Sequence, residues 1–377
     1  MSAPIYLDYN ATAPLKPAVI EAVAAALAAT GNPSSVHRFG RLARRTVETA
    51  REQVAALVNM APASVVFTGS GTEANNLALC QARAAGRPIL VSAIEHDSVL
   101  RAAPGATQIP VTADGVVDLD TLDRLLAGRE GALVAVMLAN NETGVIQPVA
   151  DVARVAHAHG ASVHCDAVQA AGKIAVDMAA FGADTLALSA HKLGGPQGVG
   201  ALIVSERATV KPQIGGGGQE RGRRAGTENV AGIAGFGVAA SLAIADLWKM
   251  GELARLRDAA ETRLKAVAPE AMVFGASAAR LPNTICIAMP GVAAETQVMA
   301  LDLAGVAVSA GSACSSGKVK PSHVLAAMGA GALAGSAIRV SGGWRSTAEE
   351  FDRFVEAWTS LWARLGAPRV ASVAPAA

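Results

Sequence analysis

Six short apolar runs, separated by stretches with a helical pattern, constrain the fold of this chain more than any other feature. The runs cover residues 65–67, 89–92, 132–138, 162–165, 184–188 and 200–204. Strands that alternate with helices are typical of a largely parallel sheet covered by helices on both faces. After about residue 250 the pattern changes to helical stretches at 252–267, at 294–303 and from Thr347, around a strand-like run at 283–288. We therefore predict an α/β unit followed by a separate α+β unit.

Length and charge narrow the classes of protein to which the chain can belong. With 377 residues it exceeds what one hydrophobic core usually spans, which favours two subdomains. The net charge of +1, without a long basic stripe, argues against a nucleic-acid partner. The first residues lack the basic and apolar regions of a secretion signal. The apolar stretch 231–245 is shorter than the roughly 20 residues of a membrane span, so we interpret it as a buried helix and expect a cytoplasmic protein without a membrane partner.

Lys192 stands where an apolar run ends, in the segment Ser189-Ala-His-Lys192, and leads into a glycine-rich turn. An ammonium without a partner is costly to bury, so this lysine has little packing reason to be there. A desolvated lysine is a nucleophile towards aldehydes, and Ser189, His191 and turn N–H groups can hold a phosphate. The segment therefore predicts a Schiff-base site for pyridoxal 5′-phosphate. The alternative is a solvated surface lysine, the ordinary state of this residue type.

Two other strand ends complete this interpretation. Asp166 ends the run at 162–165, and a carboxylate there can keep the nitrogen of a pyridine ring protonated, while Gln169 can donate to the phenolic oxygen of that ring. Gly71 and Thr72 begin a helical pattern after the run at 65–67, where unpaired N–H groups suit a phosphate. The alternatives are ordinary helix caps at both places. The glycine run at 215–218 is not followed by the GK[ST] of a nucleotide-binding loop.

Four segments together resemble the cysteine desulfurases of the NifS/IscS-like type, within the class V aminotransferases. They are Ser189-Ala-His-Lys192, Gly216-Gly-Gly-Gln219 to Asn229, Asn140-Asn141-Glu-Thr-Gly144 and Ser309-Ala-Gly-Ser-Ala-Cys314. The match runs in order from Tyr6 to Ser341. It implies an α/β fold of fold type I, the aspartate-aminotransferase-like arrangement, in a homodimer. We expect an N-terminal segment (1–15) that joins the small domain, a large cofactor domain (16–250), a small domain (251–366) and a disordered tail (367–377).

The resemblance also implies a role for each matching position. Lys192 holds the cofactor and moves the α-proton of the substrate, and His96 stacks on the pyridine ring and serves as acid and base. Arg339, with Asn141, binds the substrate carboxylate, because a planar guanidinium binds a carboxylate in a bidentate manner. Cofactor contacts are implied for Thr72, Asp166, Gln169, Ser189, His191 and Thr227, the last lent across the dimer interface. Taken singly, His96, Asn141 and Arg339 have ordinary alternatives, as a half-buried histidine, a turn former and a surface ion-pair residue.

The four cysteines show no zinc-type spacing. Cys80, Cys165 and Cys286 lie in apolar surroundings and are expected to be reduced core residues. Cys314 lies among Ser, Gly and Ala, near a lysine, where a mobile and reactive thiol is expected. The resemblance makes Cys314 the nucleophile that takes sulfur from L-cysteine as a persulfide, releases alanine and passes sulfur to an acceptor or iron–sulfur scaffold protein. Nucleic acid enters only indirectly, through partners that thiolate tRNA.

Some alternatives stay open at this point. Gln197 and the triplet Gly343-Trp-Arg345 depart from the family pattern and leave the sulfur acceptor undecided. A selenocysteine lyase, a cysteine-sulfinate desulfinase or a class V aminotransferase would use the same cofactor. A sulfur carrier or scaffold without cofactor, built on a decayed enzyme fold, is a further alternative, against which the set Lys192, Asp166, His96 and Arg339 speaks.

Overall fold

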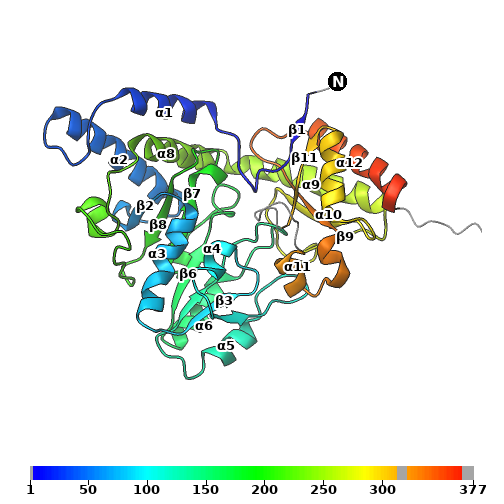
Figure 1. Cartoon of the computed structure of the whole chain (residues 1–377), viewed down its shortest axis with the longest axis horizontal. Coiled ribbons are helices and arrows are strands. Elements are labelled where there is room, and N and C mark those ends of the chain that lie inside the picture. The colour runs from blue at the N-terminus through cyan, green and yellow to red at the C-terminus, as the bar shows by residue number, and fades with distance from the viewer. Residues whose placement is uncertain (1–2, 312–320, 367–377) are drawn as a thin grey trace, which may run out of the picture.

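Two units with separate sheets make up the molecule, as Figure 1 shows in this computed structural model, which describes residues 3–311 and 321–366. Within these ranges the larger sheet has seven strands in the order β2-β8-β7-β6-β5-β3-β4. They are β2 (Val65–Thr68), β3 (Ile89–Ser92), β4 (Thr107–Ile109), β5 (Leu133–Ala135), β6 (Ser162–Asp166), β7 (Thr185–Ser189) and β8 (Gly200–Val204). All neighbouring strands are parallel except β8, which is antiparallel to both its neighbours. The predicted α/β fold is confirmed.

Helices cover both faces of this sheet because its strands are apolar on both sides. On β2, Val65 and Phe67 belong to the largest core, together with residues of the helices α2, α6 and α8, whereas Val66 packs on the other face beneath α3. On β7, Leu186 likewise belongs to the largest core, whereas Ala187 packs on the other face. Alternation along a strand places successive side chains on opposite faces. The helices of this unit are α1 (Pro17–Ala28), α2 (Arg38–Leu57), α3 (Gly71–Ala84), α4 (Asp97–Leu100), α5 (Leu119–Leu126), α6 (Val149–Ala158), α7 (Met178–Phe181) and α8 (Val230–Ala245).

The second unit has its own sheet and its own core. The sheet order is β12-β13-β10-β9, formed by β9 (Met272–Val273), β10 (Thr284–Ala288), β12 (Ser309–Ala310) and β13 (Ala337–Ser341). Its helices are α9 (Met250–Val267), α10 (Ala294–Leu303), α11 (His323–Ala327) and α12 (Ala348–Leu361). The start of the chain joins this unit, because β1 (Ile5–Tyr6) pairs in parallel with β11 (Val306–Ala307), and Ile5 and Leu7 belong to its core. These separate cores support a division near residue 250, which stays a prediction.

Several details differ from the sequence-based expectation. The run at 132–138 forms a strand only at Leu133–Ala135, and the three-residue strand β4 was missed because Thr107–Ile109 is too short for a periodic pattern. The helical stretch predicted from Thr347 is present as α12, which Thr347 caps in a capping box with Glu350. Cys80 is partly exposed on α3, so its assignment to the core is wrong, while Cys165 and Cys286 are buried. The expected disorder of 367–377 concerns residues outside the described ranges.

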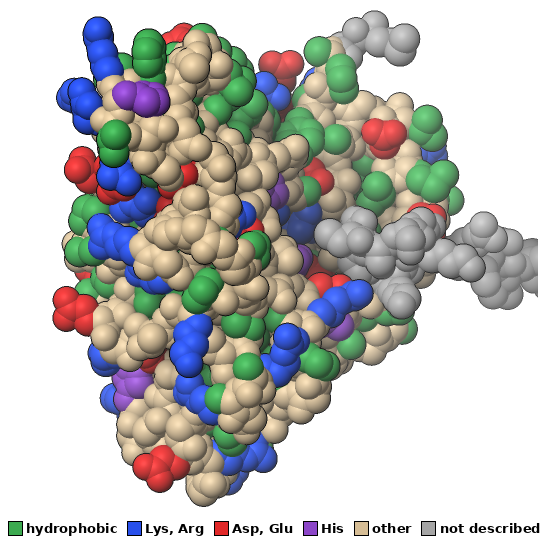
Figure 2. Space-filling model, turned by 60° about the vertical axis from the view of Figure 1, so that its left-hand side comes forward, with side chains coloured by type: hydrophobic (Ala, Val, Ile, Leu, Met, Phe, Trp, Pro, Cys, Tyr) green, Lys and Arg blue, Asp and Glu red, His purple; other side chains and the backbone are tan. Residues whose placement is uncertain are grey.

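The apolar stretch at 231–245 forms helix α8, which is buried along much of its length against the large sheet and α2. No single helix in the described ranges is long and apolar enough to cross a bilayer. Only α8 and α9 taken together, bent by 53° at their junction, meet the length and composition limits. On the face shown in Figure 2, Lys and Arg side chains are spread among acidic and apolar ones instead of forming one stripe.

Candidate active site

A cavity of about 280 Å³ lies where β6 and β7 end and α3 begins. Parallel strands end at the same edge of a sheet, and this is where α/β folds place their ligands. The pairing of Asp166 with Ala187 sets the ends of β6 and β7 side by side. The cavity brings together most of the predicted site residues, namely Gly71, Thr72, His96, Asn141, Asp166, Gln169, Ser189, His191 and Lys192.

Lys192 ends the short 3-10 turn that follows β7. Its Nζ donates to the main-chain oxygens of Asn10, at 2.6 Å, and of Ala11, at 2.8 Å. The N-terminal segment therefore crosses the cavity beside the amine, and Ala11 lines it. The placement of a lysine amine at the end of a central strand agrees with the sequence-based interpretation.

Asp166 ends β6 with its side chain almost buried. Its Oδ2 accepts from Asn75 Nδ2 at 2.7 Å, and its Oδ1 accepts from the Val168 main-chain N–H at 2.9 Å. Both donors fix the plane of the carboxylate, which faces the cavity. An anion held in this way can neutralise a cationic ring nitrogen.

The N-terminus of α3 forms another part of the cavity wall. Ser70 caps this helix by accepting from the Glu73 N–H at 3.1 Å, and Gly71 and Thr72 then face the cavity. A Cβ on Gly71 would lie 2.9 Å from Val168 Cγ2 and 3.2 Å from Ser189, so this position has no space for a side chain. The helix N-terminus offers unpaired N–H groups and a positive dipole end to an anion.

Two histidines line the cavity, and both are neutral. His191 Nδ1 lies 3.1 Å from Thr12 Oγ1, and burial, assisted by the charge of Lys192, lowers its pKa to about 4. Burial also lowers the pKa of His96, against the opposing charge of Asp166 and with the help of Lys192. A neutral imidazole can donate through one ring nitrogen and accept through the other.

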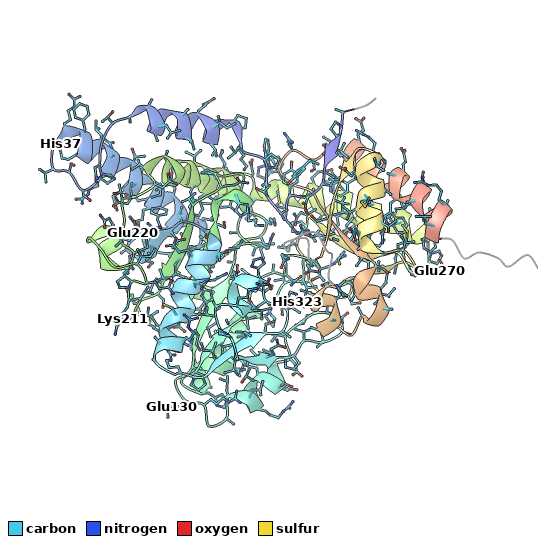
Figure 3. All side chains as sticks on the ribbon, in the orientation of Figure 1. His37, Glu130, Lys211, Glu220, Glu270 and His323 are labelled. Carbon is cyan, nitrogen blue, oxygen red and sulfur yellow. The ribbon has the colours of Figure 1, made fainter. Side chains whose placement is uncertain are left out.

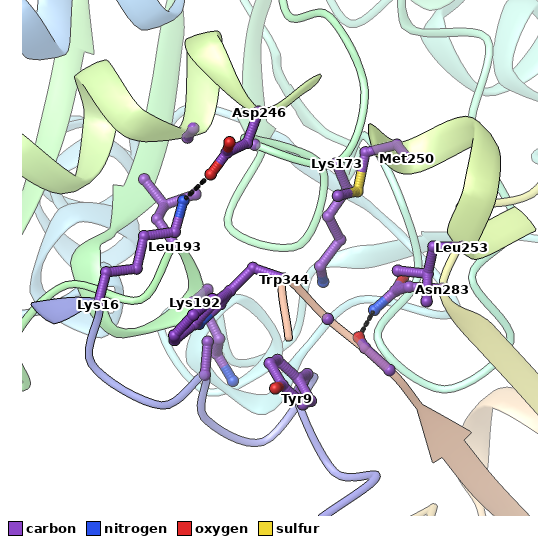
Figure 4. A pocket seen from close by; sticks show the side chains of 15 residues that line it. Tyr9, Lys16, Lys173, Lys192, Leu193, Asp246, Met250, Leu253, Asn283 and Trp344 are labelled. Atoms are coloured by element: carbon purple, nitrogen blue, oxygen red, sulfur yellow. Dashed lines mark hydrogen bonds and ion pairs between the residues drawn. The ribbon is translucent and has the colours of Figure 1, made fainter. Parts of the chain in front are cut away.

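Gln169 makes two hydrogen bonds within the chain. Its Nε2 donates to the main-chain oxygen of Asn10 at 2.9 Å, and its Oε1 accepts from Lys173 Nζ at 2.8 Å. Lys173 also donates to Asn10 Oδ1 at 2.8 Å, and burial lowers its pKa well below the usual range, with Lys192 and Arg339 adding to the effect. One amide hydrogen of Gln169 is therefore already used. In Figure 4, which shows a smaller neighbouring cavity, Lys173 and Lys192 both line the wall.

Arg339 lies on β13, close to Asn141 but outside the lining of the cavity. Its Nη1 donates to the Asn141 main-chain oxygen at 3.1 Å, and its Nη2 pairs with Asp8 Oδ1 at 2.7 Å. The buried Nε of Arg339 meets no acceptor among the described residues. This orphaned donor leaves hydrogen-bonding capacity for a carboxylate.

Two predicted residues are not brought into the cavity by this single chain. Thr227 is exposed and does not line the cavity, so a cofactor contact could arise only from a second copy. Cys314 lies outside the described residues, between Gly311, which follows β12, and Ser322, which caps α11.

The model of the aminotransferase class-V family matches residues 5–354. The chain belongs to the class V aminotransferases, in the group of cysteine desulfurases. A cysteine desulfurase of Cereibacter sphaeroides is 43% identical over 93% of this chain and 94% of its own length. The cysteine desulfurase IscS of Dictyoglomus turgidum is 40% identical over 93% of each chain. A NifS-like protein from Rickettsia africae has a TM-score of 0.89 at 37% identity, with 96% of this chain and 99% of that chain covered. The predicted family is confirmed.

Class V aminotransferases use pyridoxal 5′-phosphate, as predicted, and the cavity fits this cofactor. Lys192 offers an amine for its aldehyde carbon, Asp166 a carboxylate for its ring nitrogen, and the start of α3 with Ser189 and His191 a set of donors for its phosphate. The volume of about 280 Å³ is near the lower end for small-molecule sites, about 300 Å³. One chain therefore brings every predicted cofactor-binding residue except Thr227 to the cavity.

Sequence reasoning missed four polar residues, of which Asn75 and Ser98 line the cavity and His164 and Lys173 lie behind its wall. Asn75, Ser98, His164 and Lys173 are all almost fully buried, and each is hydrogen-bonded to a neighbour of the cavity. Their signal in the sequence was weak, because a single Asn, Ser or Lys is usually exposed. Asn75 follows Gly71 by one helical turn, so both lie on one face of α3. This spacing could have identified Asn75 as a site residue.

Proposed function

We propose that this protein is a cysteine desulfurase, in which L-cysteine and the Cys314 thiol give L-alanine and a persulfide on Cys314. The observation that carries the proposal is one cavity that holds Lys192, Asp166 and His96, in a chain related to cysteine desulfurases over nearly its whole length. In the reaction the substrate carbon–sulfur bond breaks and a sulfur–sulfur bond forms. The sulfur is oxidised, the carbon is reduced, and the carbon takes up a proton.

Each of these residues of the cavity has a separate role in the reaction. When bound, pyridoxal 5′-phosphate supplies an electron sink next to the α-carbon of the substrate. Lys192 would hold the cofactor and, as a free amine, would move the α-proton of the substrate. Asp166 stabilises the protonated ring nitrogen. His96, neutral and close to both groups, exchanges protons with the substrate.

Arg339 and Asn141 orient the substrate. The Arg339 guanidinium is already held by Asp8 and by the Asn141 carbonyl, so it needs little reorganisation to receive a carboxylate. The orphaned Nε of Arg339 supports this assignment. The substrate amine would then face Lys192 across the cavity.

A homodimer is part of the proposal. Helices α1 and α2 expose Ile20, Leu27, Phe39 and Leu42, each with more than half of its surface accessible, in a region joined to α8 by a groove of about 780 Å³. An apolar surface of this kind is typical of a protein interface. A second copy seated there would also account for Thr227, which this chain leaves outside its own cavity.

We infer that the acceptor of the sulfur is a protein of iron–sulfur cluster assembly or of another sulfur-cofactor route, a proposal supported by a relative that carries the name IscS. A cytoplasmic location stays a prediction. The proposed chemistry favours it, because a persulfide carrier requires a compartment that keeps thiols reduced. The alternatives are selenocysteine lyase, cysteine-sulfinate desulfinase and transamination.

One experiment separates these activities. Purified protein, yellow from bound cofactor, is given L-cysteine and dithiothreitol without any keto acid, and alanine and sulfide are measured. We expect both in equal amounts. A transaminase would form no alanine under these conditions, and a selenocysteine lyase would act on selenocysteine but barely on cysteine.

A further inference from the structure

A row of buried polar side chains in the cavity wall joins Asp166 to His96. Asn75, on α3, is at its centre with 1% of its surface exposed. Its Nδ2 donates to Asp166 Oδ2 at 2.7 Å and to Ser98 Oγ at 2.8 Å. Ser98 Oγ in turn lies 2.8 Å from His96 Nδ1. The two site residues are therefore connected through two buried side chains.

The direction of these hydrogen bonds follows from Asp166. A carboxylate only accepts, so the Asn75 amide must turn its nitrogen toward Asp166 and its oxygen away. That oxygen lies 2.9 Å from His164 Nε2, which therefore carries a proton. Burial lowers the pKa of His164 to about 4, so the ring is neutral and its Nδ1 accepts from Thr185 Oγ1 at 2.9 Å. Every member of this branch has one consistent role.

The other branch fixes His96. Ser98 Oγ receives an Asn75 hydrogen, which leaves the hydroxyl hydrogen of Ser98 for His96 Nδ1. The Ser98 main-chain N–H also donates to Nδ1, at 3.1 Å. Because Nδ1 accepts twice and the imidazole is neutral, its proton lies on Nε2.

We propose that Asn75 is a positioning residue that, through Ser98, keeps His96 in the tautomer with its proton on Nε2, and with the same amide holds the Asp166 carboxylate. The proposal deepens the desulfurase assignment, on which its functional consequence rests. In the resting protein, His96 can donate its proton from Nε2. It can accept another proton at Nε2 only after that donation. Uptake at Nδ1 would break two hydrogen bonds.

The charged groups around His96 shift its pKa. The hydrogen bonds decide which ring nitrogen carries the proton of the neutral imidazole. Asp166 and Asp97 favour the charged imidazole, whereas Lys192 and His323 disfavour it. His323, which is labelled in Figure 3, is the first residue of α11. Its Nε2 lies 2.9 Å from the Glu95 main-chain oxygen. These charges act on the protonation of the whole ring, so the donor pattern at Nδ1 is the local feature that sets the tautomer.

The test is a nitrogen-15 NMR spectrum of cofactor-loaded protein labelled in histidine, in which two-bond proton–nitrogen correlations distinguish the tautomers. The chain has seven histidines, so His96→Gln identifies the His96 signals by their loss. We expect the Nε2–H tautomer in the wild type. A wild-type His96 with its proton on Nδ1 overturns the proposal.

Asn75→Asp is the decisive variant. Its new carboxyl keeps the shape of the side chain and shares one proton with the Asp166 carboxylate, which the Asn75 amide contacts at 2.7 Å. It then turns an acceptor toward Ser98, which directs its hydroxyl hydrogen away from His96. We expect the Nδ1–H tautomer to appear and kcat to fall about tenfold or more, with the KM for cysteine less affected. Asn76→Asp is the matched control: Asn76 is the next residue of α3, donates only to the Thr72 carbonyl and should leave the spectrum unchanged.

Ser98→Ala keeps the proposal testable if Asn75→Asp does not fold. It removes the hydroxyl and retains the main-chain N–H, so we expect a mixture of the two tautomers. An unchanged tautomer in either folded variant would show that the backbone alone sets it and would overturn the role of Asn75. These spectra need no substrate, so a protein with the expected tautomers but no release of alanine from cysteine would contradict the proposed function alone.

Discussion

Arg339 and Asp8 form an ion pair with Nη2 and Oδ1 2.7 Å apart, although they are separated by most of the chain. The pair is largely buried, and Asp8 Oδ2 also accepts from Ser309 Oγ at 2.7 Å. The N-terminal segment thus reaches across the small sheet and fixes the guanidinium beside Asn141 before any substrate arrives. A binding group held in this way loses little conformational freedom on binding.

Replacement of this guanidinium should affect substrate binding more than turnover. Arg339→Lys keeps the charge but loses the planar fork, so we expect the KM for cysteine to rise roughly 10- to 100-fold, equivalent to about 1.5–3 kcal/mol of a charged hydrogen bond. Steady-state kinetics of alanine formation measure it. The exposed Arg345→Lys is the control. An unchanged KM would remove Arg339 from substrate binding.

Lys192 should carry the cofactor. Reduction of the yellow protein with borohydride, followed by peptide mapping, should label Lys192 and no other lysine. Lys173 is the stringent internal control, because it is buried close to Lys192 and hydrogen-bonded only to amide oxygens in the described chain. A label on Lys173 or on Lys211 would contradict the assignment.

Asp166→Ala should still bind the cofactor at Lys192 but lose most of its turnover. Loss of one preorganised electrostatic partner of the reacting group commonly lowers kcat about 100- to 1000-fold. The variant also removes an acceptor from Asn75, so its visible spectrum and its thermal midpoint are recorded together with kcat. Near-normal turnover would exclude Asp166 from the mechanism.

The residues that the sequence revealed share a property. Lys192, Asp166 and Gly71 each stand at the end or start of a regular element, where a change of hydrophobic period marks the position. Asn75 and Lys173 lack this mark, because their partners come from segments far away in sequence, at Asp166 and Asn10. β4 is too short to show a hydrophobic period. The antiparallel direction of β8 depends on its pairing with β2 and β7, which no local sequence pattern reveals.

Acid should destabilise the protein in part through His164. Burial lowers the pKa of His164 to about 4, below its ordinary 6.5, so the unfolded chain binds this proton more readily than the folded one. Its contribution is intact above about pH 6.5 and is lost as the pH falls toward 4, by roughly 3 kcal/mol. Urea unfolding at pH 7.5 and 4.5 measures the loss, which should be smaller in His164→Gln. Equal losses in both proteins would contradict this account.

Cys314→Ser separates cofactor chemistry from sulfur transfer. The groups proposed to bind the cofactor and the substrate carboxylate are side chains other than Cys314. The Ser variant should therefore stay yellow and change its spectrum when cysteine is added, since Lys192, His96 and Arg339 are intact. A serine hydroxyl cannot take up the substrate sulfur, so we expect no persulfide and almost no alanine. Mass spectrometry of the protein and quantification of alanine measure the two products. Alanine released at the wild-type rate would instead indicate a direct lyase or an aminotransferase, with Cys314 as a bystander.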